Sequence, residues 1–269
     1  MRHTRMAACC SALVLATACP ATAPASAWGA ARTPAPGYVA LGDSYSSGVG
    51  AGDYLPGRRE CKRSSRSYPM LWAAAHHAAA FAFPACNGAR VGDVLGGQLG
   101  ALGPRTRLVT LTVGGSDVGF GSAMAICALG GPVPCLAAVS QARTVMAREL
   151  PRSLDRLYSA IRDRAPAAHV VVLGYPHLYH LEGTCRSGLK DTERAAIDSA
   201  VDRLDAVIAG RATGHGFSFA DVRAAFAGHE ICSRDPWLHS VDPFAPTESY
   251  HPTAPGQAHG YFPALDRAS

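Results

Sequence analysis

Two residues that lie far apart in the sequence could together carry out acyl transfer. Ser44 lies in the small-residue segment GDSYSSG (42–48), directly after a short β-rich run, and His251 lies in ESYHP (248–252), near the end of the chain. A serine hydroxyl needs a neighbouring base to act as a nucleophile near pH 7, and histidine is the usual base. Each residue alone has an ordinary interpretation, because Gly, Asp and Ser favour turns. As a pair, they predict a nucleophile and its base.

The elements that must position this pair alternate between short β-rich runs and longer helical stretches. The expected strands are at 38–41, 81–83, 108–113, 169–173 and 217–219. The third and fourth of these runs are continuously apolar, as strands buried on both faces must be. The pattern predicts a parallel sheet with helices on both faces. Ligands bind such folds at the carboxyl ends of the strands, where Ser44 is expected.

Two helical stretches have apolar residues at helical spacing. The first covers 136–164, and Pro151 is expected to kink or split it. The second follows Asp191, whose side chain can cap it.

The N-terminal residues indicate export. Two arginines precede an apolar run from Met6 to about Ala18, and the sequence ASA follows at 25–27. This arrangement is typical of a signal peptide with its cleavage site. A lipid-anchored Cys19 is an alternative, but Ala16 stands where such a signal usually has a large aliphatic residue. We expect a signal peptide at 1–27, a single domain at 28–269 and an extracellular protein.

The composition of the remaining 242 of the 269 residues suits one α/β domain. No later apolar run is long enough to span a bilayer, so no stable membrane insertion is expected. Loss of the signal leaves a net charge of about +3 with both signs interspersed, which does not suggest a nucleic-acid partner. A monomer is expected.

Six cysteines remain after the signal, and an even number in an exported chain indicates disulfides. Six cysteines allow fifteen pairings, which sequence alone cannot distinguish. Pairing of neighbours in order closes short or moderate loops and is our prediction: Cys61–Cys86, Cys127–Cys135 and Cys185–Cys232. A metal site is not expected, because CxxC is absent and HEIC (229–232) lacks a second histidine. No cofactor is expected.

Four segments in order along the chain resemble the sequence blocks of the SGNH (GDSL) hydrolases. GDSYSSG (42–48) and SYHP (249–252) are similar to the first and last blocks, and ACNGA (85–89) matches the glycine of the second block at Gly88. The third block is usually GGND, whereas this chain has GGSD at 114–117. The resemblance spans about residues 37–260. CKRS (61–64) and GHEIC (228–232) further resemble the secreted three-disulfide esterases and lipases.

The resemblance implies a three-layer α/β/α sandwich with a five-stranded parallel sheet of flavodoxin-like order. It also implies that Ser44 attacks an ester carbonyl and that His251 takes its proton and later protonates the leaving alcohol. The oxyanion hole would consist of the backbone N–H groups of Ser44 and Gly88 and the side chain of Ser116. Family members often have an Asp three residues before the histidine. Glu248 holds that position here, either as an acid that orients the imidazole or as a residue of the rim.

Position 116 is the main departure from the family, because the third oxyanion donor is usually an asparagine amide. Loss of one donor costs about 10² to 10³ in rate. The expected function is a secreted carboxylic ester hydrolase of esterase or lipase type, acting on small-molecule or lipid esters. The alternatives are a carbohydrate or phospholipid deacylase, and a weakly active or inactive binding protein. Acyl-chain length, alcohol and natural substrate cannot be predicted from the sequence.

Overall fold

The computed structural model describes residues 37–185 and 188–269, and its sheet contains five parallel strands. The strands are β1 (Tyr38–Ala40), β2 (Phe81–Ala82), β3 (Leu108–Leu111), β4 (His169–Leu173) and β5 (Ser218–Ala220). Their order is β2-β1-β3-β4-β5. This is the flavodoxin-like order, which confirms the predicted fold class. The predicted signal peptide at 1–27 lies outside the described residues.

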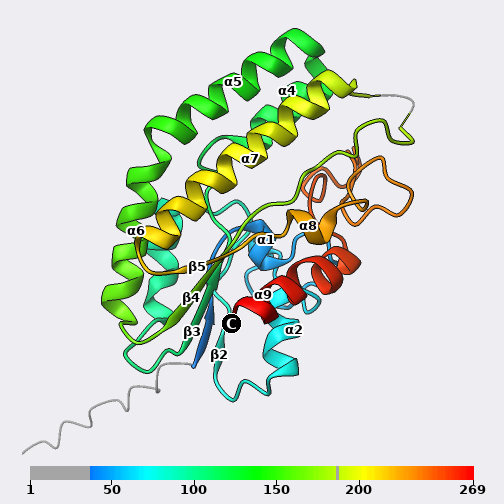
Figure 1. The fold of residues 1–269 in the computed structure, drawn as a ribbon. Coiled ribbons are helices and arrows are strands. Elements are labelled where there is room, and N and C mark those ends of the chain that lie inside the picture. The colour runs from blue at the N-terminus through cyan, green and yellow to red at the C-terminus, as the bar shows by residue number, and fades with distance from the viewer. Residues whose placement is uncertain (1–36, 186–187) are drawn as a thin grey trace, which may run out of the picture. The chain divides into compact units, whose positions relative to one another are not determined.

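Helices cover both faces of the sheet and form the outer layers (Figure 1). The helices of the described residues are α1 (Ser44–Ser47), α2 (Tyr68–Ala75), α3 (Val91–Asp93), α4 (Phe120–Gly130), α5 (Pro132–Arg148), α6 (Leu150–Arg164), α7 (Asp191–Gly214), α8 (Arg223–Phe226) and α9 (Phe262–Ala268). Short 3₁₀ or π turns are η1 (Arg59–Cys61), η2 (Val94–Gln98), η3 (Leu99–Ala101) and η4 (Gly256–Tyr261). Helices α5, α6 and α7 lie on one side of the sheet, and α2 and α9 lie on the other.

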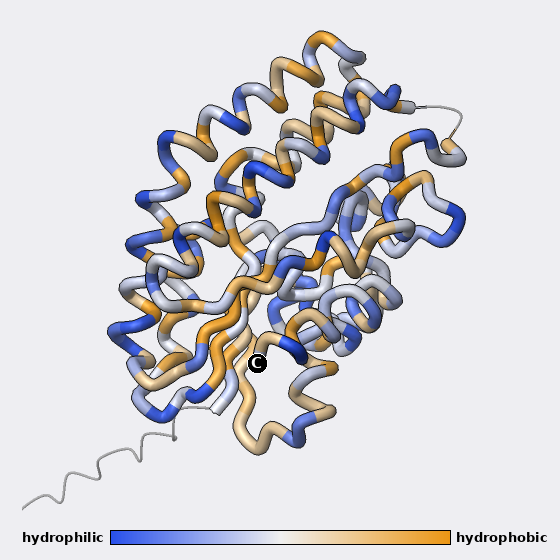
Figure 2. Tube along the Cα trace, viewed as in Figure 1, coloured by the Kyte–Doolittle hydropathy of each residue, from blue (hydrophilic) through white to orange (hydrophobic). Residues whose placement is uncertain are grey.

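The central strands are buried on both faces. Every residue of β3 is buried, and β4 is buried from Val170 to Leu173. Figure 2 shows these strands in the colour of strongly hydrophobic residues. Burial of a continuous apolar strand stabilises the fold by about 25 cal/mol for each Å² removed from water. The sheet is therefore a rigid platform for the loops at its carboxyl edge.

The helical stretch expected at 136–164 is split near Pro151, as predicted, but it begins earlier, at Pro132. The division into α5 and α6 lies at Glu149, two residues before Pro151. Proline fits the first turn of a helix because it has no N–H to leave unpaired, so Pro151 starts α6 rather than kinking a longer helix. Asp191 does not cap α7. It is the first helical residue, and its carboxylate pairs with Arg194 instead.

Three disulfides join the six cysteines of the described residues. Cys61 is bonded to Cys86, Cys127 to Cys135, and Cys185 to Cys232. The second bond links α4 to α5 across a tight turn, and the third joins two loops that are 47 residues apart in sequence. Among residues 37–185 and 188–269, no helix is both long enough and apolar enough to cross a membrane.

Candidate active site

Ser44 is the first residue of α1, which starts four residues after the end of β1. The side chain of Asp43 caps this helix by accepting a hydrogen bond from the Tyr45 N–H at 3.0 Å. Gly42 has a φ of 120°, and a Cβ there would clash with the carbonyl oxygen of Thr112. The glycine and the cap together turn the chain sharply. The turn presents Ser44 at the carboxyl edge of the sheet.

His251 meets Ser44 although 207 residues separate them. The Ser44 hydroxyl lies 2.7 Å from Nε2 of His251 and donates to it. The other ring nitrogen, Nδ1, lies 3.0 Å from the backbone carbonyl oxygen of Ser249, to which it donates. This second bond fixes the tautomer in which Nε2 is the free base. The arrangement can therefore take a proton from the serine.

The loop that carries His251 is held by backbone and side-chain hydrogen bonds. The Tyr45 hydroxyl donates to the Tyr250 carbonyl at 2.7 Å. His239 exchanges two backbone bonds with this loop, one with Tyr250 and one with His251, each at 2.9 Å. Tyr250 itself has a φ of 66°, which is uncommon for a residue other than glycine. The bonds around it hold this backbone conformation, and so fix the direction of the imidazole.

The Glu248 carboxylate has other partners than His251. It accepts hydrogen bonds from the Tyr54 hydroxyl at 2.8 Å and from Nζ of Lys62 at 3.2 Å. The Ser249 carbonyl occupies the position at Nδ1 that an orienting acid would need. Of the two interpretations of Glu248, the structure therefore favours the rim residue.

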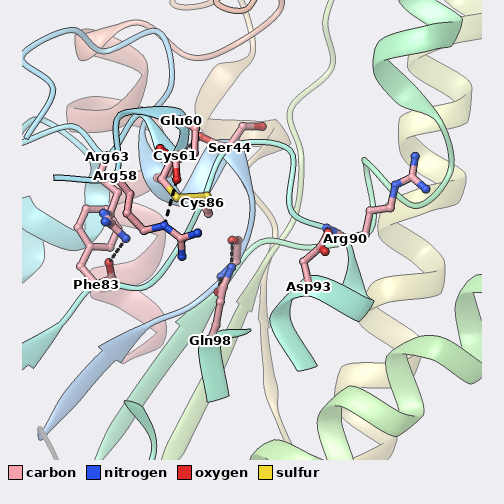
Figure 3. The surroundings of a disulfide bond; sticks show 12 residues. Ser44, Arg58, Glu60, Cys61, Arg63, Phe83, Cys86, Arg90, Asp93 and Gln98 are labelled. Atoms are coloured by element: carbon pink, nitrogen blue, oxygen red, sulfur yellow. Dashed lines mark hydrogen bonds and ion pairs between the residues drawn. A yellow bond between two sulfur atoms is a disulfide. The ribbon is translucent and has the colours of Figure 1, made fainter. Parts of the chain in front are cut away.

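Gly88 lies at the edge of the site on a loop held by the first disulfide. The N–H of Cys86 donates to the Gly42 carbonyl at 3.0 Å, and the N–H of Asn87 donates to the Cys61 carbonyl at 3.1 Å. Figure 3 shows the Cys61–Cys86 bridge in the same region as Ser44. The φ of Gly88 is 74°, in the region that favours glycine. Bridge and backbone bonds thus fix the Gly88 loop relative to the turn that carries Ser44.

Ser116 follows β3 and lines the same pocket as Ser44 and Gly88. The next residue, Asp117, accepts a hydrogen bond from the Val91 N–H at 3.1 Å. This bond ties the loop after β3 to the first turn of α3, just beyond Gly88. The three residues of the expected oxyanion hole therefore come from three different segments that are linked to one another by hydrogen bonds.

A buried polar network supports the turn that precedes Ser44 through the carboxylate of Asp43. Asp43 accepts from Oγ1 of Thr112 at 2.6 Å and from the Tyr175 hydroxyl, which in turn accepts from the Gly115 N–H at 3.2 Å. Burial raises the pKa of Asp43 to about 6, although these bonds favour its charged form. The network links the turn before Ser44 to the loop that carries Ser116.

Gln98 braces the same turn from η2. Its side chain accepts from the Gly42 N–H at 2.7 Å and donates to the Gly42 carbonyl at 2.9 Å (Figure 3). Sequence reasoning missed Gln98, Thr112 and Asp43 as supports of the site. Nothing in their local sequence signals these partners, because the contacts with Gly42 and Asp43 span 56 to 69 residues.

A cavity of about 530 Å³ opens beside the Ser44–His251 pair. Volumes of roughly 300 to 1,000 Å³ are typical of ligand sites. Its walls away from the pair are mostly apolar and come from α4, α7 and the loops after β4 and before His251. They include Phe120, Met124, Ala125, Ala128, Leu129, Leu178, Val201, Leu204, Val241, Pro243 and Pro246. The Ser44–His251 pair at one end and an apolar body suit a substrate with an apolar chain.

The comparisons with known proteins agree with this geometry. A family model described as the GDSL-like lipase/acylhydrolase family matches residues 40–259. The chain belongs to this family. The family model spans every block that carries the resemblance in the sequence, from the Ser44 turn to His251.

Relatives of this GDSL hydrolase cover 86% to 100% of its length. It is 52% identical to "Lipase 1" of Streptomyces coelicolor over 100% of both chains. A crystal structure of an extracellular lipase from Streptomyces rimosus is 55% identical, covers 86% of this chain and 99% of its own, and superposes with a TM-score of 0.84. A phospholipase A1 from Streptomyces albidoflavus is 52% identical, covers 87% of this chain and 100% of its own, and has a TM-score of 0.85. This GDSL hydrolase is therefore a carboxylic ester hydrolase.

His177, His180 and Trp237 lie outside the pocket of this GDSL hydrolase. His177 pairs with Asp202 at 2.8 Å, and His180 pairs with Glu230 at 3.2 Å. Trp237 stacks on His229 rather than forming a wall of the pocket. Within the described part of the chain, no group of three or more His, Cys, Asp or Glu residues is placed to hold a metal ion.

The acid limb of activity should lie well below the ordinary histidine pKa. Burial of the imidazole lowers the pKa of His251 from 6.5 to about 4. A base is active when it is neutral, so activity is present above this pKa and is lost as the pH falls through it. We expect kcat/KM for a soluble ester to reach half its plateau near pH 4, with folding followed by circular dichroism. If kcat/KM of the folded protein instead reached half its plateau near pH 6.5, the lowered pKa of His251 would be contradicted.

Proposed function

We propose that this protein is a secreted lipase or phospholipase that hydrolyses fatty-acyl esters through Ser44 and His251. The observation that carries the proposal is the 2.7 Å contact between Oγ of Ser44 and Nε2 of His251 at the polar end of an apolar cavity. The disulfides and the extracellular lipase among the relatives support secretion with removal of residues 1–27. One chain is sufficient for the reaction, because each group of the site comes from the same chain.

The reaction follows from the two hydrogen bonds of His251. Nε2 takes the proton from Ser44 while Oγ bonds to the ester carbonyl carbon, which gives a tetrahedral oxyanion and an imidazolium. The imidazolium then protonates the alcohol oxygen as its bond to carbon breaks, leaving an acyl-serine. A water molecule then attacks the acyl carbonyl carbon while Nε2 takes its proton. The bond between this carbon and Oγ of Ser44 breaks, the imidazolium returns the proton to Oγ, and the carboxylic acid leaves. The Ser249 carbonyl accepts from Nδ1–H throughout and stabilises the charged ring.

The oxyanion is stabilised by donors that the fold sets before the reaction begins. The backbone N–H groups of Ser44 and Gly88 and the hydroxyl of Ser116 act in this role. Donors held rigidly in place need no reorganisation as negative charge develops, which is why they act more strongly on the transition state than on the substrate. The links from Asp117 to Val91 and from Asp43 to Tyr175 provide this rigidity.

The substrate is an ester with a long acyl chain, because the cavity beyond Ser44 is lined mainly by apolar side chains. A phospholipid is the second candidate, supported by the phospholipase A1 at 52% identity. Both substrates place the acyl chain in the cavity and differ only in the alcohol. Hydrolysis of matched triacylglycerol and phosphatidylcholine substrates separates the two candidates.

The apolar cavity predicts a strong dependence on acyl-chain length. Burial of each CH₂ contributes up to about 0.8 kcal/mol, so kcat/KM should rise by up to about fourfold for each added CH₂ until the cavity is full. A series of p-nitrophenyl esters from acetate to palmitate, each below its critical micelle concentration, measures this dependence. A preference for acetate over every longer chain would contradict an acyl-binding role for the cavity.

Ser116 tests the oxyanion assignment directly. We expect Ser116→Asn to raise kcat by about tenfold, a fraction of what a full donor contributes. Ser116→Ala should lower kcat, and KM should change little in both variants because the gain arises where charge develops. If Asn leaves kcat unchanged and Ala behaves like wild type, residue 116 is not a donor. Asn87→Ala would then test whether the side-chain amide of Asn87, the residue before Gly88, is the donor instead. Asn87 lines the same pocket.

A further inference from the structure

Exposed large hydrophobic side chains are concentrated in two short segments. In the described residues, eight such side chains are exposed, and six of them lie in 126–136 and 241–244. The most exposed are Phe244 at 96%, Leu129 at 89% and Val133 at 79%. Single exposed apolar side chains are normal on a protein surface, but a cluster marks an interaction site. We call these two segments together the apolar rim.

The first segment is the turn between α4 and α5, at the tip of their hairpin (Figure 1). Every residue from 128 to 134 is exposed. No Asp, Glu, Lys, Arg or His occurs from 118 to 142, which is 25 consecutive uncharged residues in a chain with 17% charged residues. A solvent-facing helical hairpin would ordinarily have charged residues on its outer face. The absence of charge therefore indicates that this tip meets an apolar medium.

Two covalent or local constraints hold the apolar rim outward. The Cys127–Cys135 bond closes the hairpin across the tip, so Leu129 and Val133 remain at its end. In the second segment, the Asp242 carboxylate accepts from the Phe244 N–H at 2.8 Å, and the Asp242 N–H donates to Oγ of Ser249 at 2.9 Å. These bonds restrict the backbone that carries the exposed side chains before any partner is present, which lowers the entropic cost of binding.

The apolar rim is continuous with the acyl cavity. Leu129 from the hairpin and Val241 from the second segment both line the cavity, and both are also exposed to solvent. Asp242 has the only charged side chain in the second segment, and neither segment contains Lys or Arg. A surface without cations offers no attraction for anionic headgroups.

We propose that the apolar rim docks this protein on a neutral lipid surface, with its side chains inserted among the headgroups and the mouth of the acyl cavity against the lipid. An acyl chain can then enter the cavity from the lipid without crossing water. The proposal rests on the proposed function only in that the lipid contains the substrate. Docking itself needs neither Ser44 nor His251.

Binding to vesicles tests docking without hydrolysis. The full chain with Ser44→Ala is mixed with sucrose-loaded phosphatidylcholine vesicles, and the bound fraction is measured by sedimentation. Val133→Asp and Phe244→Asp, each added to this background, should lower the partition coefficient by about tenfold or more, because a carboxylate must lose water to enter the headgroup layer. The matched control is Ala147→Asp, an exposed position of α5 outside the apolar rim. This control should bind like the Ser44→Ala parent.

The outcomes separate the surface from the active site. Val133 and Phe244 do not line the cavity. When Ser44 is intact, both Asp variants should therefore hydrolyse soluble p-nitrophenyl acetate at the wild-type rate. The same variants should lose activity on vesicles. Failure of the parent to bind vesicles, or equal binding by the Val133→Asp and Ala147→Asp variants, would overturn docking. Binding that requires anionic lipid and disappears at 0.5 M salt, on the order of a 4 Å Debye length, would place the contact elsewhere. A dimer that Val133→Asp dissociates, with no binding to vesicles, would assign the apolar rim to a second copy of the chain.

Discussion

Replacement of Ser44 by Ala should lower kcat for ester hydrolysis by about 10⁴-fold or more, and His251→Ala should have an effect of the same order. The first change removes the atom that bonds to the substrate, and the second removes the base 2.7 Å from it. The double variant should be little worse than either single variant, because the two residues act as one unit. Initial rates with a soluble chromogenic ester measure all three.

Glu248→Gln is the matched control for these variants. It removes a negative charge three residues before His251, but the carboxylate contacts Tyr54 and Lys62 rather than the imidazole. We expect kcat within about threefold of wild type, a small fraction of the loss from a catalytic group. A loss of 10³-fold or more would assign the orienting role to Glu248. Retention of more than about a tenth of kcat in Ser44→Ala would refute the nucleophile.

Removal of the Cys185–Cys232 bond should destabilise the fold more than removal of the Cys127–Cys135 bond. The first bond closes a loop with a sequence separation of 47, against 8 for the second. Chain entropy alone then gives about 4 kcal/mol for the longer loop and about 2.5 kcal/mol for the shorter one. We expect the paired Ala variants to lower the free energy of unfolding in this order, as measured by urea denaturation.

The two paired alanine variants differ mainly in the length of the loop that each disulfide closes. Both variants replace two cysteines by alanine, so the change in side-chain chemistry is matched. An equal or larger loss for the Cys127–Cys135 variant would mean that local contacts at the hairpin, rather than restriction of the unfolded chain, dominate its contribution. Activity on soluble esters should survive removal of the hairpin bond below the unfolding temperature, because Cys127 and Cys135 do not line the cavity.

The sequence could predict the sheet because its signal is local. Runs such as 108–113 and 169–173 are continuously apolar, short and rich in β-branched residues, which favours a strand covered on both faces. The observed strands lie within two residues of each expected boundary. Ser44, Gly88 and Ser116 each follow a strand, so parallel topology alone places them at one edge of the sheet.

The details that orient the site could not be predicted in this way. A spacing of three residues between Glu248 and His251 does not determine where the carboxylate points, and Lys62, 186 residues away, binds it instead. The Gln98 and Tyr175 bonds likewise join segments that no local pattern connects. Helix α4 was missed because 120–130 contains two glycines and no charged residue that would mark a polar face.

The carbonyl of Ser249 has a consequence for how this enzyme tolerates mutation. Where a carboxylate orients the catalytic histidine, a single substitution can delete it. A main-chain oxygen is present whatever amino acid occupies the position, so no point mutation at residue 249 can remove the acceptor. The position most sensitive to substitution is then Tyr250, because its φ of 66° helps to direct the Ser249 carbonyl oxygen toward the His251 ring. Evolution of this esterase should therefore constrain residue 250 by backbone conformation, excluding β-branched residues and proline, while it leaves residue 248 free to drift.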